Sequence, residues 1–164
     1  MELDKKLRML SRSINVVYYT IYLLTIIAVV VIFFMTYGEV EVEKIAPNSK
    51  LGINISTVYM IFLLVSIPAS LFLFHQHTLK LRKEPDEMLK FSKYKKASYI
   101  RLWVIGSGLI IGIILVYLLR SQSMIFMSAI AAIALYFCKP SALKITRELE
   151  LENDDDVVTG KKYL

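Results

Sequence analysis

Cysteine is almost missing from this sequence, which contains Cys138 as the only one among 164 residues. A single cysteine cannot form an intrachain disulfide, because each bridge needs two thiols. This excludes membrane protein families whose large outer loop is held by disulfides, such as tetraspanins and claudins.

Charged residues are missing from the centres of the long apolar runs. Ionisable side chains inside a membrane usually mark proton coupling, ion pathways or substrate counter-ions. A small multidrug transporter, for example, needs a carboxylate in its first membrane helix, and the first apolar run here contains none. The sequence therefore argues against a proton-coupled transporter that acts alone.

The sequence motifs of known enzyme classes are also lacking. Nothing resembles a P-loop, a GxSxG nucleophile elbow, an HExxH helix or a dinucleotide-binding fingerprint. His75 and His77 are the only histidines, and two positions so spaced on a helix point in nearly opposite directions. We therefore expect no catalytic residue, no metal site and no cofactor.

Apolar residues are what the sequence does contain, at 56% of the chain, and they are concentrated in four runs. A soluble domain is nearer about 45–50% apolar. As a helix the first run would measure roughly 36 Å, enough to cross a hydrocarbon core of ~30 Å. The pattern predicts an all-α polytopic membrane protein with four transmembrane helices. The expected spans are residues 14–37, 53–74, 99–119 and 123–138.

Lysine and arginine are distributed unevenly between the connections. Seventeen of the 20 lie in the N-terminal segment, around the connection 79–98 and in the tail 139–164. Because basic loops stay on the cytoplasmic side, both termini are expected in the cytoplasm, and the protein is expected in a bacterial inner membrane. Despite the net charge of +6, we expect the basic residues to contact anionic lipid headgroups rather than nucleic acid. The candidates for headgroup contact are Lys90, Lys93, Lys95, Lys96 and Arg101.

Two helices are expected to reach beyond the membrane. Residues 1–13 place Leu3, Leu7 and Leu10 on one helical face and basic residues on the other, which predicts an amphipathic helix lying on the inner membrane surface. The alternative is a disordered basic leader. A second helix is expected to run unbroken from Pro85 to Leu119, since no breaker intervenes.

Two segments show the period-2 alternation of β-strands. In the cytoplasmic tail 139–164, residues 143–152 alternate and favour a strand that pairs with a partner protein, with a solvated acidic tail as the alternative. In the first connection, residues 40–45 and 51–55 are consistent with a small hairpin, with an unordered loop as the alternative.

Small residues in the third and fourth runs predict close helix packing. Gly108 and Gly112 form a GxxxG pattern, which lets two helix backbones approach closely. The simpler expectation is that spans three and four pack on each other, and the alternative is a homodimer through these two glycines. The full set of candidate packing residues is Gly106, Gly108, Gly112, Ser128 and Ala132.

Mild polar residues in the first two runs are candidates for a polar groove. Three of them are spaced i, i+4, i+7 on the first run, and the others surround a proline in the second. The alternative is that they bond their own backbone or sit at the interfaces. The candidate groove residues are Tyr18, Tyr22, Thr25, Ser66, Pro68 and Ser70.

These features favour a non-catalytic membrane protein that acts as an accessory or scaffolding subunit of a membrane complex. The expected partners are membrane lipids and either another membrane protein or further copies of the chain. One alternative is a subunit of a homo-oligomeric small-molecule transporter or channel, in which the polar groove lines the pathway. A third hypothesis is a lipid-modifying enzyme that uses His75, His77 and the basic connection.

Overall fold

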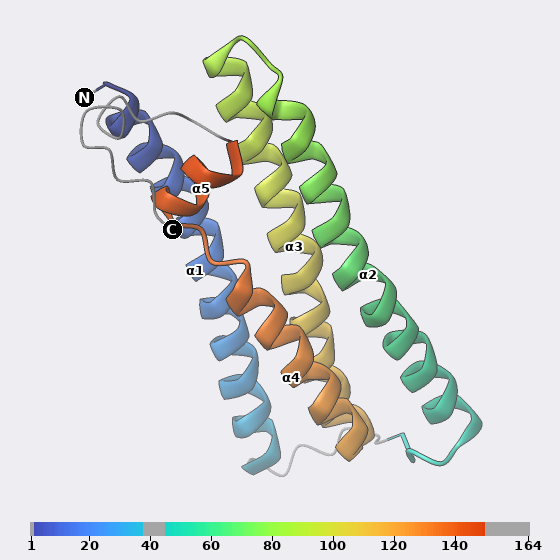
Figure 1. Cartoon of the computed structure of the whole chain (residues 1–164). Helices are drawn as coiled ribbons and strands as arrows, with labels where there is room; N and C mark the ends of the chain where they lie inside the picture. Colours follow the sequence, from blue (N-terminus) through green and yellow to red (C-terminus); the bar gives the residue numbers. More distant parts are fainter. Residues whose placement is uncertain (1, 38–44, 150–164) are drawn as a thin grey trace, which may run out of the picture.

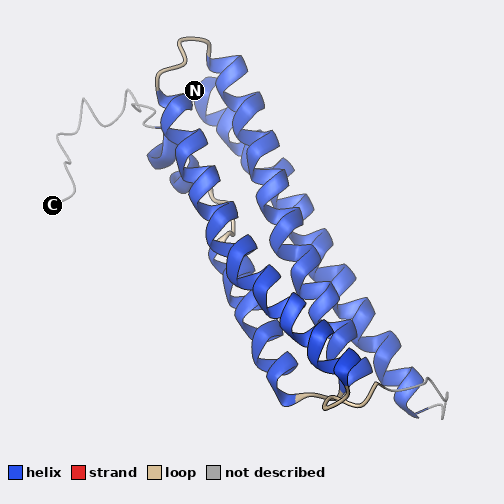
Figure 2. Ribbon diagram, turned by 90° about the vertical axis from the view of Figure 1, so that its right-hand side faces the viewer, coloured by secondary structure: helices blue, strands red, loops and turns tan. Residues whose placement is uncertain are grey.

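The computed structural model describes residues 2–37 and 45–149, in which the regular elements are all helices joined by short connections. Figures 1 and 2 show long helices lying side by side, with a short helix across one end. The expectation of an all-α fold is confirmed. The helices are α1 (Glu2–Tyr37), α2 (Lys50–Arg82), α3 (Glu87–Leu119), α4 (Gln122–Phe137) and α5 (Ala142–Leu149).

Three of the helices are long and apolar enough to cross a membrane, namely α1, α2 and α3. Each measures roughly 50 Å, so each is about 20 Å longer than the hydrocarbon core of a bilayer. α4 and α5 together qualify as a fourth span that is bent by 77°. Three to four spans therefore agree with an integral membrane protein, and the exposed outer side chains of α1 and α2 are mostly apolar.

Capping residues fix where α2 and α3 begin. Ser49 is the N-cap of α2, and its Oγ accepts a hydrogen bond from the Gly52 amide at 3.0 Å. The N-cap of α3 is Asp86, whose Oδ1 accepts from the Met88 amide at 2.9 Å. α3 therefore begins at Glu87 rather than at Pro85, and otherwise runs unbroken to Leu119 as expected. The expected second arm of a hairpin, residues 51–55, is wrong because it forms the first turns of α2, whereas most of the first arm lies outside the described residues.

α3 is the centre of the bundle. It packs against α1, α2 and α4, whereas α1 and α2 do not pack against each other within the described ranges. In Figure 1, α3 lies between α1 and α2, with α4 in front of it. α1 and α2 are therefore consecutive in the sequence but are held together by packing against α3.

The leading segment, residues 2–13, continues without a break into the rest of α1. Leu7, Leu10 and Ile14 are buried, and the Tyr99 hydroxyl of α3 donates to the Ser13 carbonyl at 3.3 Å. α5 also packs against α1. The apolar side chains Leu7, Leu10 and Ile14 of α1 are thus covered by the protein itself, and the location of this segment at a membrane surface stays a prediction.

The strand expected over residues 143–152 is wrong for the part that is described, because Ala142–Leu149 forms α5. Ile145 and Leu149 are four residues apart and are both buried where α5 packs across α1 and α2. This i, i+4 pair makes one apolar face of a helix. The remaining residues of that segment lie outside the described residues.

Candidate functional site

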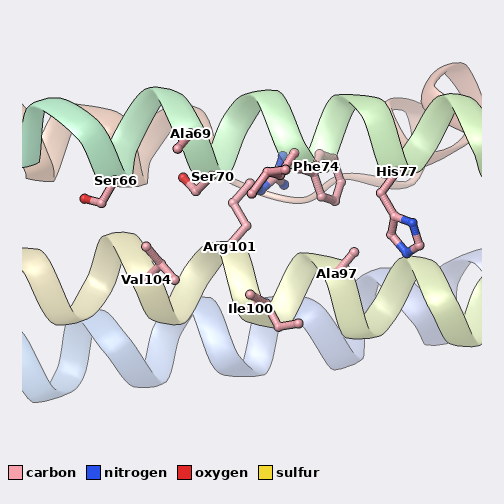
Figure 3. A pocket seen from close by; sticks show the side chains of 10 residues that line it. Ser66, Ala69, Ser70, Phe74, His77, Ala97, Ile100, Arg101 and Val104 are labelled. Carbon is pink, nitrogen blue, oxygen red and sulfur yellow. The ribbon is translucent and has the colours of Figure 1, made fainter.

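A cavity of about 390 Å³ lies between α2 and α3. Figure 3 shows His77 of α2 at one end and Ser66 of the same helix at the other. Eleven residues along a helix correspond to roughly 16 Å, so the cavity follows the helices for about three turns. Its walls are mostly apolar, formed by residues such as Ala69, Leu73, Ile100 and Val104.

Arg101 of α3 is the charged residue of this cavity. Its side chain reaches toward α2 between Ser70 and Phe74 (Figure 3), and only 6% of the residue is exposed. Its Cζ lies 3.6 Å from the centroid of the Phe74 ring, a cation–π contact. Arg101 was expected to reach the lipid headgroups from the helix surface, and the structure instead turns its side chain into the bundle.

The Arg101 guanidinium is not neutralised by a carboxylate. Within residues 2–37 and 45–149 it forms no ion pair, and its Nε has no hydrogen-bond partner. A buried charge without a paired counter-charge is costly, and a guanidinium carries five N–H donors that the face of one ring cannot satisfy. Within the described residues, Arg101 is therefore a buried cation without an ion-pair partner beside an apolar cavity.

Glu148 of α5 is close to this region but is bonded elsewhere. Its Oε2 accepts a hydrogen bond from the Tyr94 hydroxyl at 2.5 Å, and its carbonyl accepts one from Arg82 Nε at 3.0 Å. Burial and the neighbouring Glu148 carboxylate both raise the pKa of Tyr94 well above its usual range, so that the hydroxyl keeps its proton and donates. α5 is thereby fastened to the ends of both α2 and α3.

The lysines expected to contact headgroups lie on the part of α3 that precedes the apolar run. Lys93 forms an ion pair with Glu84 at 2.9 Å, and Lys95 lies 5.6 Å from the centroid of the Tyr99 ring. Lys96 is exposed and Lys90 is half-buried. Unlike Arg101, these four remain at the surface or near it.

The three glycines of α3 face three different neighbours within the chain. A methyl group at Gly106 would lie 2.7 Å from Ile21 Cγ2 of α1, and one at Gly108 would lie 2.9 Å from Leu63 Cδ2 of α2. A methyl group at Gly112 would overlap the Tyr59 hydroxyl and lie 2.5 Å from the Ser128 hydroxyl of α4. The surface that a homodimer through Gly108 and Gly112 would need is occupied by α2 and α4. Ala132 of α4 packs at the edge of the same core.

The candidate polar groove is divided by α3. Its first group is on α1, where Tyr18 is buried, Tyr22 is half-buried and Thr25 Oγ1 donates to the Ile21 carbonyl at 2.8 Å. Its second group is on α2, where Ser66 and Ser70 line the cavity beside Arg101 and Pro68 is exposed. Since α1 and α2 do not pack together, the structure does not bring the two groups into one groove.

The histidines and the cysteine are also separate. His75 is exposed, whereas His77 lines the cavity and Cys138 is buried between α4 and α5. No group of three His, Cys, Asp or Glu side chains able to hold a metal ion occurs in the described part of the chain.

A second surface feature is a polar stripe on the outer face of α1, which we define as Arg12, Asn15, Tyr19 and Thr20. With Val16 and Leu23 these residues line a shallow groove of about 590 Å³. Their spacing of three and four residues places them on one side of the helix. None of these four residues is among the site residues predicted from the sequence. Arg12, Asn15 and Tyr19 nevertheless show an i, i+3, i+7 pattern of polar residues around the start of the first run, with Thr20 directly after them.

Comparisons with protein-family models, with curated proteins and with solved structures gave no match to this chain.

Proposed function

We propose that this protein is a non-catalytic subunit of a larger complex in a bacterial inner membrane, and that it binds its partner through the polar stripe on α1. The observation that carries the proposal is the position of this stripe. It lies on the outer face of the helix, away from the contacts that α1 makes with α3 and α5.

Polar side chains that face lipid are unfavourable, and a neighbouring helix that hydrogen-bonds to them removes this cost. Arg12 and Tyr19 are exposed in the single chain. The Thr20 hydroxyl donates to the Val16 carbonyl at 2.8 Å and Asn15 Nδ2 donates to Ser11 Oγ at 3.4 Å, so the groups left for a partner are Arg12, Tyr19 and Asn15 Oδ1, which has no partner within the described residues. A partner helix seated in this groove would cover an amide oxygen, a hydroxyl and a guanidinium at once. The groove is therefore better suited to a protein helix than to acyl chains.

The charge of the stripe favours a different protein over a second copy. In a symmetric dimer the same surface meets itself, so two Arg12 side chains would approach each other. Like charges in such a contact repel. A partner that places an acidic or carbonyl group opposite Arg12 avoids this repulsion.

The experiment is purification of the tagged full-length protein from its host in mild detergent, followed by mass spectrometry of the eluate. We expect one unrelated membrane protein in fixed ratio. Arg12→Glu and Asn15→Leu should each remove most of it, whereas the matched control Arg8→Glu, an exposed arginine one turn earlier, should retain it. A homo-oligomer alone, or a partner that survives both substitutions, contradicts the proposal; the homo-oligomer would favour the transporter or channel alternative.

A further inference from the structure

The cavity between α2 and α3 joins two features that are seldom found together in a helical bundle. Its middle holds Arg101, between Ser70 and Phe74 (Figure 3), which is 94% buried and has no ion pair in the described part of the chain. The rest of the cavity is walled by apolar side chains. A ligand that complements both would carry a negative charge at one end and hydrocarbon at the other.

We propose that this cavity binds one anionic phospholipid, whose phosphate group pairs with the guanidinium of Arg101. Guanidinium presents planar, paired donors that match phosphate oxygens, and a charge-assisted pair of this kind is stronger than a neutral hydrogen bond. His77 lines the cavity three residues, about one helical turn, beyond Phe74, and an imidazole N–H is a further hydrogen-bond donor. The acyl chain lies along the apolar walls toward Ser66.

The place of the cavity along the helices agrees with a lipid. Phe74 and Arg101 lie where the apolar runs of α2 and α3 meet their basic ends, the level at which headgroup phosphates sit. From Phe74, which Arg101 contacts, to Ser66 the cavity extends roughly 12 Å into the apolar part of the bundle. Its length and direction are thus those of a lipid glycerol region and the first part of a chain.

The charges of the lining select an anionic lipid over a zwitterionic one. Arg101 carries a positive charge, and the residues that line the cavity include no aspartate or glutamate. Phosphatidylglycerol brings one unbalanced negative charge to this site. Phosphatidylcholine brings a trimethylammonium group as well, for which the lining offers no counter-charge.

The test is native mass spectrometry of the purified full-length protein with added phosphatidylglycerol or phosphatidylcholine. We expect one phosphatidylglycerol to be retained with about tenfold preference over phosphatidylcholine. Arg101→Gln should weaken its retention about tenfold or more. The matched control Lys50→Gln removes an exposed charge at the other end of α2 and should change retention by less than about twofold.

A second variant tests the proposal in case Arg101→Gln fails to fold. Ala69→Leu fills the apolar part of the cavity and leaves Arg101 and Phe74 unchanged. We expect it to keep the thermal midpoint of the wild type and to lose the lipid. Unaltered retention of phosphatidylglycerol in both Arg101→Gln and Ala69→Leu would overturn the proposal. Displacement of the lipid by millimolar inorganic phosphate would overturn it too, because it would show that the site takes a free anion. Neither result depends on the partner surface of α1, which is on another helix.

Discussion

Gly112→Ala is the substitution whose cost the structure defines best. The added methyl group would overlap the Tyr59 hydroxyl and lie 2.5 Å from the Ser128 hydroxyl. Tyr59 has little freedom to move away, because its hydroxyl is buried and donates to the Gly108 carbonyl at 3.0 Å. Overpacking of this kind costs about 1–3 kcal/mol, and loss of the hydrogen bond costs about 1 kcal/mol more. The better helix propensity of alanine returns about 1 kcal/mol, so we expect a net loss of roughly 1–3 kcal/mol in the free energy of unfolding.

Gly108→Ala is the matched control on the same helix. Its added methyl group would lie 2.9 Å from Leu63 Cδ2, the far end of a flexible side chain, and at an ordinary contact distance of 3.5 Å from Phe62 Cε1. We expect a change of less than about 1 kcal/mol, since a small rotation of that leucine relieves the contact.

The assay uses Cys138, the only cysteine of the chain, which is 1% exposed in the folded protein. A thiol-reactive fluorescent dye therefore reports unfolding in detergent as the temperature rises. Tyr59→Phe removes the hydroxyl that opposes the new methyl group, so the Gly112→Ala penalty should be smaller by about 1 kcal/mol in that background. Close packing around Gly112 is refuted if Gly112→Ala is as stable against unfolding as the wild type, or if Gly108→Ala lowers the stability more than Gly112→Ala.

Two further predictions concern the first part of α3, far from Gly112, and use the same thiol assay. Asp86→Ala should destabilise the protein by about 1 kcal/mol through loss of the N-cap of α3, whereas Asp86→Asn should be nearly neutral because its side-chain oxygen still accepts from the Met88 amide. Tyr94→Phe should cost about 1–3 kcal/mol near neutral pH, since it removes a hydrogen bond to the Glu148 carboxylate. Because the pKa of Tyr94 is raised in the folded state, only the unfolded chain releases this proton as the pH rises above ~10, so stability falls there, and Tyr94→Phe should make the fall less steep.

The sequence predicts the helices well where their determinants are local. The apolar runs, the absence of helix breakers and the capping residues can all be read from the sequence. α3 differs from its predicted range only in that the helix begins two residues later, at Glu87. That difference arises because Asp86 caps the helix with its side chain, so Pro85 is left outside.

The predictions fail or stay open where tertiary contacts, rather than the local sequence, determine the conformation. Ile145 and Leu149 fit both a period of 2 and a spacing of four, and the surface made by α1 and α2 selects the helix. Arg101 lies near the end of an apolar run, and its position in the sequence does not show whether its side chain lies on the helix surface or inside the bundle. Only the rotation of α3 about its axis, which places Arg101 against Phe74, turns the charge inward. The polar residues of α1 and α2 do not form one groove for a similar reason. Hydropathy predicts the helices but does not predict that α3 lies between α1 and α2.

The central position of α3 has a consequence for the order of assembly during synthesis. The ribosome makes α1 and α2 first, yet within the described ranges these helices pack against α3 and not against each other. They must therefore remain as separate helices after insertion, until α3 emerges between them. α5, the last of the described helices, then fastens the ends of α2 and α3 through Arg82, Tyr94 and Glu148. A chain arrested before residue 149 would thus hold its membrane helices in a bundle that is still open at one end.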